Sequence, residues 1–136
     1  MGVLVCDDTK ISVSFFARSA FAERLDISNL EIESYAEILG GSVEYASKYP
    51  GWIYSSVSKL REQYSLAAER VNGKRPHTTV IHAGLECGVI SYAVPDMDII
   101  SVGPIVRNLH SPDEFMNLES FERFFAVMIE LLINWN

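Results

Sequence analysis

The sequence predicts an α/β protein with a parallel or mixed sheet, preceded by a smaller part with an open-faced sheet. Alternating apolar and polar residues occur early, in KISVSFFA at 10–17, whereas nearly continuous apolar runs occur later, in TTVIHAG at 78–84 and MDIISVG at 97–103. Alternation is typical of a strand with one face in water, and a continuous run is typical of a strand covered on both faces. Pro50-Gly51 separates the two kinds of strand, which predicts a first part at 1–50 and a second at 51–136.

The first part is predicted to be β-α-β. Strands are expected at 10–17 and at SVEYA, 42–46, and the helix between them has apolar residues at helical spacing, Ile32, Tyr35, Ala36 and Leu39. Gly40-Gly41 is expected to end this helix in a left-handed turn. A unit of this size cannot bury a core of its own and leaves its strand edges open. It therefore resembles half of a larger domain.

The second part is predicted to be α-β-α-β-α, an order that favours a parallel sheet. Its first helix contains Val57, Leu60, Tyr64, Ala67 and Val71 and is expected to end at Asn72-Gly73. Strands at 78–84 and 97–103 flank a second helix, which starts within HAGLECG at 82–88. The last helix follows Asn117, its predicted N-cap, and is strongly amphipathic up to Trp135.

Composition limits the class of protein. A chain of 136 residues with 49% apolar and 21% charged residues is typical of a globular domain with a core of its own. The net charge of −7 argues against a nucleic acid partner, which requires a basic surface. Cys6 and Cys87 form no closely spaced pair, which favours a reducing cytoplasm. The longest apolar run, FFAVMIELLI, carries Glu130 and has helical periodicity, so no membrane partner is expected.

The stretch HAGLECG is the first candidate for chemistry. Its glycines allow close backbone approach, and the amides of the helix start would form an anion site. A helix start can also activate a thiol, so Cys87 is either a nucleophile or a buried, inert side chain. His82 and Glu86 could both bind a metal, but they straddle a junction between strand and helix, and two ligands leave a site incomplete.

Two further candidates are Arg18 and His110. Arg18 ends the alternating strand, and its planar fork suits a carboxylate, although an exposed arginine without a role fits equally well. His110 lies in RNLHSPDEF at 107–115. The following Ser111, Pro112 and Glu114 match a helix-capping box, so His110 is either a ligand or a bystander before a helix.

A family resemblance favours the ligand. IHAGLECG at 81–88, DMDIISVGPIVRNLHSPDEF at 96–115 and YPGW at 49–52 resemble the C-terminal region of aminoacyl-histidine dipeptidases, also called Xaa-His or cytosol nonspecific dipeptidases. These are co-catalytic zinc peptidases with a lid domain. The resemblance covers essentially the whole chain. It implies that 1–50 is the second half of the lid, or dimerisation, domain and that 51–136 is the C-terminal part of the catalytic domain.

The resemblance also implies roles for single residues. His110 matches the last zinc ligand, and Arg18 matches a lid arginine that contacts the substrate carboxylate. The turn made by Gly84, Leu85, Glu86 and Cys87 matches the carboxylate side of the pocket. Glu114 is expected to orient the loop that carries His110, and His82 to support the site without binding metal.

The remaining ligands of the family are missing from residues 1–136: the His-x-Asp motif, the bridging aspartate, the Glu-Glu pair with the general base, and a further carboxylate. The resemblance therefore implies the C-terminal portion of a dipeptidase that hydrolyses Xaa-His and other dipeptides through a metal-activated water. Two zinc ions would belong to the intact enzyme, and the isolated chain would hold neither and be inactive. The expected partners are the dipeptide and either the missing N-terminal portion or a second copy bound through the lid strands. The alternative is a stand-alone, non-catalytic binding or oligomerisation module of the same fold.

Overall fold

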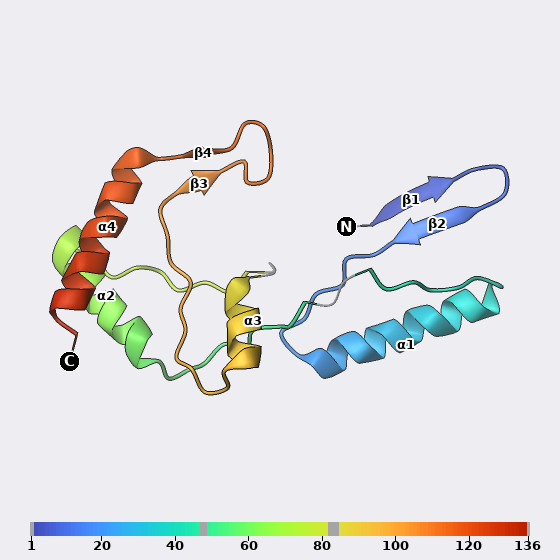
Figure 1. The fold of residues 1–136 in the computed structure, drawn as a ribbon, viewed down its shortest axis with the longest axis horizontal. Coiled ribbons are helices and arrows are strands. Elements are labelled where there is room, and N and C mark those ends of the chain that lie inside the picture. The colour runs from blue at the N-terminus through green and yellow to red at the C-terminus, as the bar shows by residue number, and fades with distance from the viewer. Residues whose placement is uncertain (1, 47–48, 82–84, 136) are drawn as a thin grey trace. The chain divides into compact units, whose positions relative to one another are not determined.

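The computed structural model describes residues 2–46, 49–81 and 85–135, and they form two compact units (Figure 1). The first unit combines residues 1–53 with 81–93, and the second combines 54–80 with 94–136. The chain thus passes between the units three times. The predicted domain boundary at residue 50 stays a prediction.

The first unit begins with a hairpin that the sequence only half predicts. Strand β1 (Val3–Cys6) pairs antiparallel with β2 (Ile11–Ser14). β2 lies within the predicted strand at 10–17, whereas β1 was not predicted. The turn is held by Asp7, because its Oδ1 accepts hydrogen bonds from the backbone N–H groups of Thr9 and Lys10, each at 2.8 Å. The bonds from Thr9 and Lys10 lower the pKa of the Asp7 carboxyl.

Helix α1 (Ala22–Ile38) ends as the sequence predicts, with Gly40 in the left-handed region at φ 71° and the Gly41 N–H bonded to the Ala36 carbonyl at 2.7 Å. The predicted strand at 42–46 is wrong, because this segment has no ladder partner among the described residues. It is tied to α1 by a side chain instead. The Tyr45 hydroxyl donates to a Glu33 carboxylate oxygen at 2.7 Å, and this bond raises the pKa of Tyr45.

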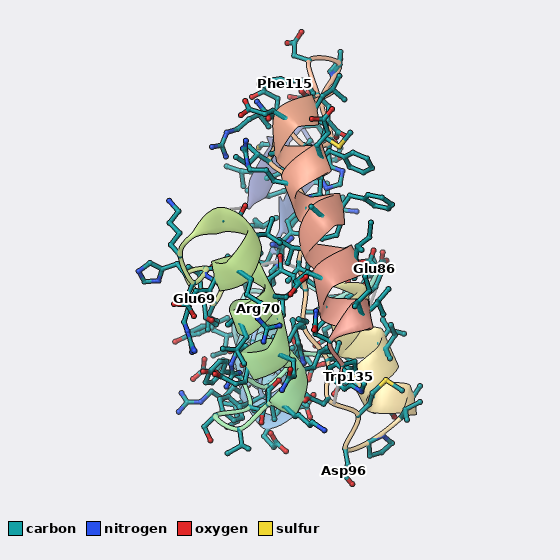
Figure 2. The ribbon with its side chains drawn as sticks, turned by 90° about the vertical axis from the view of Figure 1, so that its left-hand side faces the viewer. Glu69, Arg70, Glu86, Asp96, Phe115 and Trp135 are labelled. Carbon is teal, nitrogen blue, oxygen red and sulfur yellow. The ribbon has the colours of Figure 1, made fainter. Side chains whose placement is uncertain are left out.

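The core of the second unit lies between helices α2 (Lys59–Asn72) and α4 (Leu118–Ile133), which lie side by side (Figure 2). The buried apolar residues here are Ala67, Ala68, Val127 and Leu131, with Leu60 and Tyr64 packed against them. Both helices have the predicted ends: Gly73 adopts φ 73° after α2, and the Asn117 side chain accepts from the Ser120 N–H before α4. Periodicity and capping therefore predicted both helices correctly.

The predicted continuous strands are wrong for the described residues. Residues 78–81 and 97–103 form no ladder, and 82–84 lie outside the described residues. A strand needs a neighbouring strand, and none of the described segments pairs with these two. The second unit has instead a short antiparallel hairpin, β3 (Val106–Arg107) with β4 (Phe115–Met116), which was not predicted. The helix predicted after HAGLECG is present as α3 (Glu86–Ala93) in the first unit.

The core is smaller than the chain length led us to expect. Within the described ranges, the four α2–α4 residues are the buried apolar side chains. Among the large apolar residues of the β1–β2 hairpin, the exposed fraction runs from 50% for Val13 to 68% for Ile11. No helix in the described parts of the chain combines the length and the apolar character needed to cross a membrane. Much apolar surface is thus left open in the first unit.

Candidate functional site

His110 lies in the loop 108–114 that joins β3 to β4. The base of this hairpin is attached to the first turn of α4. The Asn117 N–H donates to the Ile105 carbonyl at 2.9 Å, and the Ile105 N–H donates to Ser120 Oγ at 2.9 Å. Ser120 is buried, so the attachment is shielded from water. The hairpin is therefore fixed to the helix that packs against α2.

The loop is bonded to itself. The His110 N–H donates to Glu114 Oε2 at 2.8 Å, and the Glu114 N–H donates to the Ser111 carbonyl at 3.1 Å. Ser111 Oγ donates to the Asn108 carbonyl at 2.7 Å and accepts from the Asp113 N–H at 3.2 Å. The capping-box residues thus close a loop and begin no helix, and α4 begins after Asn117.

Two loop residues adopt the left-handed conformation, Asn108 at φ 54° and His110 at φ 64°. Asparagine and histidine are among the non-glycine residues that tolerate this region best. The conformation costs roughly 1–2 kcal/mol per residue, so it needs compensating contacts. The hydrogen bonds within the loop supply them. His110 itself is exposed, and its imidazole is open to a ligand.

The first unit holds a close junction of three segments. A Cβ on Gly51 would lie 2.5 Å from the Ser19 carbonyl oxygen, and a Cβ on Gly88 would lie 2.6 Å from the Pro50 carbonyl oxygen. Only glycine allows such backbone approach. The segment after β2, which carries Arg18, and the first turn of α3 thus both pack on the Pro50-Gly51 segment. Arg18 is exposed in this unit.

The chain matches no family profile. It is 31% identical over 132 residues to the cytosol non-specific dipeptidase of Escherichia coli (strain K12), a match that covers 97% of this chain and 27% of that protein. Its structure is similar to the crystal structure of the aminoacylhistidine dipeptidase from Vibrio alginolyticus, with a TM-score of 0.73, 30% identity, 96% of this chain covered and 26% of that chain. The chain is similar in sequence and structure to one part of each of these dipeptidases.

Both comparisons confirm the resemblance to aminoacylhistidine dipeptidases and, through the structural match, the α/β fold class. The chain spans about a quarter of the length of these dipeptidase relatives. The activity, substrates and partners of a whole dipeptidase are therefore proposals for this chain.

The structure brings two of the predicted site residues together. His110 and Glu114 share a hydrogen bond in the second unit. Arg18, Leu85, Glu86 and Cys87 belong to the first unit, where Leu85 and Cys87 are half-buried and Glu86 is exposed. Gly84 and His82 lie outside the described residues, so the expected supporting role of His82 stays a prediction.

An imidazole is a good zinc ligand, so His110 fits the metal that the dipeptidase relatives imply. A catalytic zinc site needs about three protein ligands. In residues 2–46, 49–81 and 85–135, no group of three His, Cys, Asp or Glu side chains lies close enough to hold a metal. His110 is thus a single candidate ligand, and the described residues do not complete a set of metal ligands around it.

Sequence reasoning missed Asn108 and Asp98. Asn108 donates from Nδ2 to the Asp113 carbonyl at 3.2 Å, and its place two residues before His110 in a turn-rich stretch was the available signal. Asp98 accepts from Ser58 Oγ at 2.6 Å and from the Leu60 N–H at 2.8 Å, so it caps the start of α2. Because Asp98 stands within a continuous apolar run, it was counted as part of a strand.

Proposed function

We propose that this chain is one segment of a zinc-dependent dipeptidase, in which His110 is a metal ligand. The observation that carries the proposal is the match to dipeptidases over 97% of the chain, combined with a histidine that a self-bonded loop holds exposed. The E. coli relative is by name a non-specific dipeptidase, and the V. alginolyticus relative an aminoacylhistidine dipeptidase. Dipeptides, including Xaa-His, are therefore the proposed substrates.

In the proposed site, His110 presents its imidazole while Glu114 holds its backbone amide. A carboxylate that accepts an N–H bond makes a stronger bond than a neutral acceptor, so Glu114 limits the motion of the loop. Zinc bound there would supply a Lewis acid and an activated water for attack on the peptide carbonyl. The other ligands would come from outside this chain, since one imidazole does not complete a site.

The substrate carboxylate is proposed to bind in the first unit. The guanidinium of Arg18 has the planar fork that matches a carboxylate. The start of α3 offers backbone N–H groups at Leu85, Glu86 and Cys87, and a helix N-terminus favours an anion. The Pro50-Gly51 junction supports the proposal, because it packs the Arg18 segment and α3 against one segment.

We also propose that a further part of a longer enzyme covers the open apolar surface of the β1–β2 hairpin. The half-exposed Val13 and Ile11 would otherwise remain in water, which is unfavourable for a sheet. A second copy of the chain is the competing occupant, and it belongs to the alternative of a non-catalytic assembly module. The E. coli relative is a cytosolic protein by name, and we propose the cytoplasm for this chain as well.

Complementation tests the proposal. The E. coli dipeptidase without its matched segment is mixed with this chain, and hydrolysis of an Xaa-His dipeptide is measured with zinc present. Hydrolysis is expected only for the mixture. Turnover with stoichiometric zinc in the pure chain would contradict the expected inactivity of the chain alone. A metal-free homo-oligomer that never restores hydrolysis would instead support the assembly module.

A further inference from the structure

Asn108 takes part in three hydrogen bonds of the loop around His110. The Asn108 carbonyl accepts from both the N–H and the Oγ of Ser111, at 3.2 and 2.7 Å. The Asn108 side chain donates from Nδ2 across the loop to the Asp113 carbonyl at 3.2 Å. Asn108 therefore connects the start of the loop to its middle and to its far side, through both backbone and side chain.

His110 lies between these connections. Its N–H reaches Glu114 only while the chain from Ser111 to Glu114 folds back toward Asn108. The left-handed φ angles of 54° at Asn108 and 64° at His110 produce this reversal. An asparagine adopts such an angle more easily than most residues. Its side-chain amide then donates a hydrogen bond to the Asp113 carbonyl, where the loop returns toward β4.

We propose that Asn108 is a positioning residue for His110, a role that rests on the proposed function of His110 as a metal ligand. Asn108 does not contact the metal. It holds the reversal of the loop and so fixes the His110 backbone from which the imidazole extends. Loss of a residue that orients a metal-ligating histidine without touching the metal commonly lowers metal affinity by roughly 10–100-fold.

Two variants of Asn108 test this inference in the metal-free chain. Asn108→Asp keeps the shape and the left-handed preference but removes the N–H donor, and Asn108→Gly keeps the φ freedom but removes the whole side chain. By nuclear magnetic resonance, we expect both to accelerate exchange of the His110 amide proton by up to about tenfold, the effect of losing one neutral hydrogen bond, from Asn108 Nδ2 to the Asp113 carbonyl. The strong amide-to-Hα Overhauser effect of a left-handed His110 should weaken. Asp113→Asn is the matched control, because Asp113 joins these loop hydrogen bonds through its backbone carbonyl and N–H.

A wild-type exchange rate in both Asn108 variants would overturn the inference. Thermal unfolding should stay unchanged, because Asn108 is exposed and lies outside the α2–α4 core. A variant that unfolds early would show a merely structural role and also overturn it. In the E. coli dipeptidase carrying this chain as its matched segment, Asn108→Asp should weaken zinc retention against a chelator roughly 10–100-fold. If His110→Ala leaves zinc retention unchanged there, the proposed function fails, while the exchange result still decides whether Asn108 positions His110.

Discussion

Truncation of Leu131 should destabilise the chain far more than truncation of its neighbour Leu132. Leu131 is 6% exposed and packs in the α2–α4 core, whereas Leu132 on the same helix is 72% exposed. Leucine-to-alanine changes in a core cost about 2–5 kcal/mol, the larger values where a cavity persists. This core has four buried apolar residues, so the side chains around Leu131 can move to fill part of the cavity. We therefore expect Leu131→Ala to lower the free energy of unfolding by about 2–3 kcal/mol. For Leu132→Ala we expect about 0.5 kcal/mol or less, since little apolar surface is uncovered.

The assay is urea unfolding followed by helical circular dichroism. With a slope of about 1–2 kcal/mol/M for a chain of this size, Leu131→Ala should lower the midpoint by about 1–3 M, and Leu132→Ala should lower it by about 0.5 M or less. Both variants keep the helix propensity of alanine, so the difference reports burial alone. Equal losses would refute the assignment of the core to this face of α4. They would show that the outer face of the helix is covered too.

Three further outcomes follow from the contacts. Hydrogen bonds from the start of α2 lower the pKa of Asp98 below 3.8, so its ionised form stabilises the fold above about pH 4, and this contribution is lost as the pH falls through the lowered pKa. Asp98→Ala should therefore reduce the loss of stability at acid pH in unfolding curves. An unchanged curve would reject Asp98 as a cap of α2. Gly88→Ala places a Cβ 2.6 Å from a backbone carbonyl and should speed amide exchange across α3, whereas Gly103→Ala, with nothing within 4 Å, should not. Iodoacetamide should label the exposed Cys6 before the half-buried Cys87; the reverse order, with a pH dependence near neutrality, would support a cysteine nucleophile.

Local signals predicted the helices, because a helix is stabilised by residues close in sequence. Asn117 and Gly73 cap their helices as expected, and the apolar spacing of α2 and α4 reports the faces that meet. Strands depend on partners that are distant in sequence. The runs at 42–46 and 97–103 have strand-like patterns but find no ladder among the described segments, so their patterns alone were misleading.

The candidate site shows the same division. Glu114 was expected to orient the loop that carries His110, and the bond from the His110 N–H to Glu114 has the form expected of that role. The junction of Gly51 and Gly88 could not be predicted, because it joins segments far apart in the chain. The two-residue strands β3 and β4 are too short for any periodic pattern. The zinc-binding role of His110 remains a prediction.

Zinc content tests that role most directly. The protein is the E. coli dipeptidase in which this chain replaces the matched segment of 132 residues, and bound zinc is counted after dialysis. We expect His110→Ala to lose zinc and dipeptide hydrolysis together, and His77→Ala, which removes another exposed histidine, to lose neither. Full zinc content and hydrolysis in a folded His110→Ala protein would contradict the account.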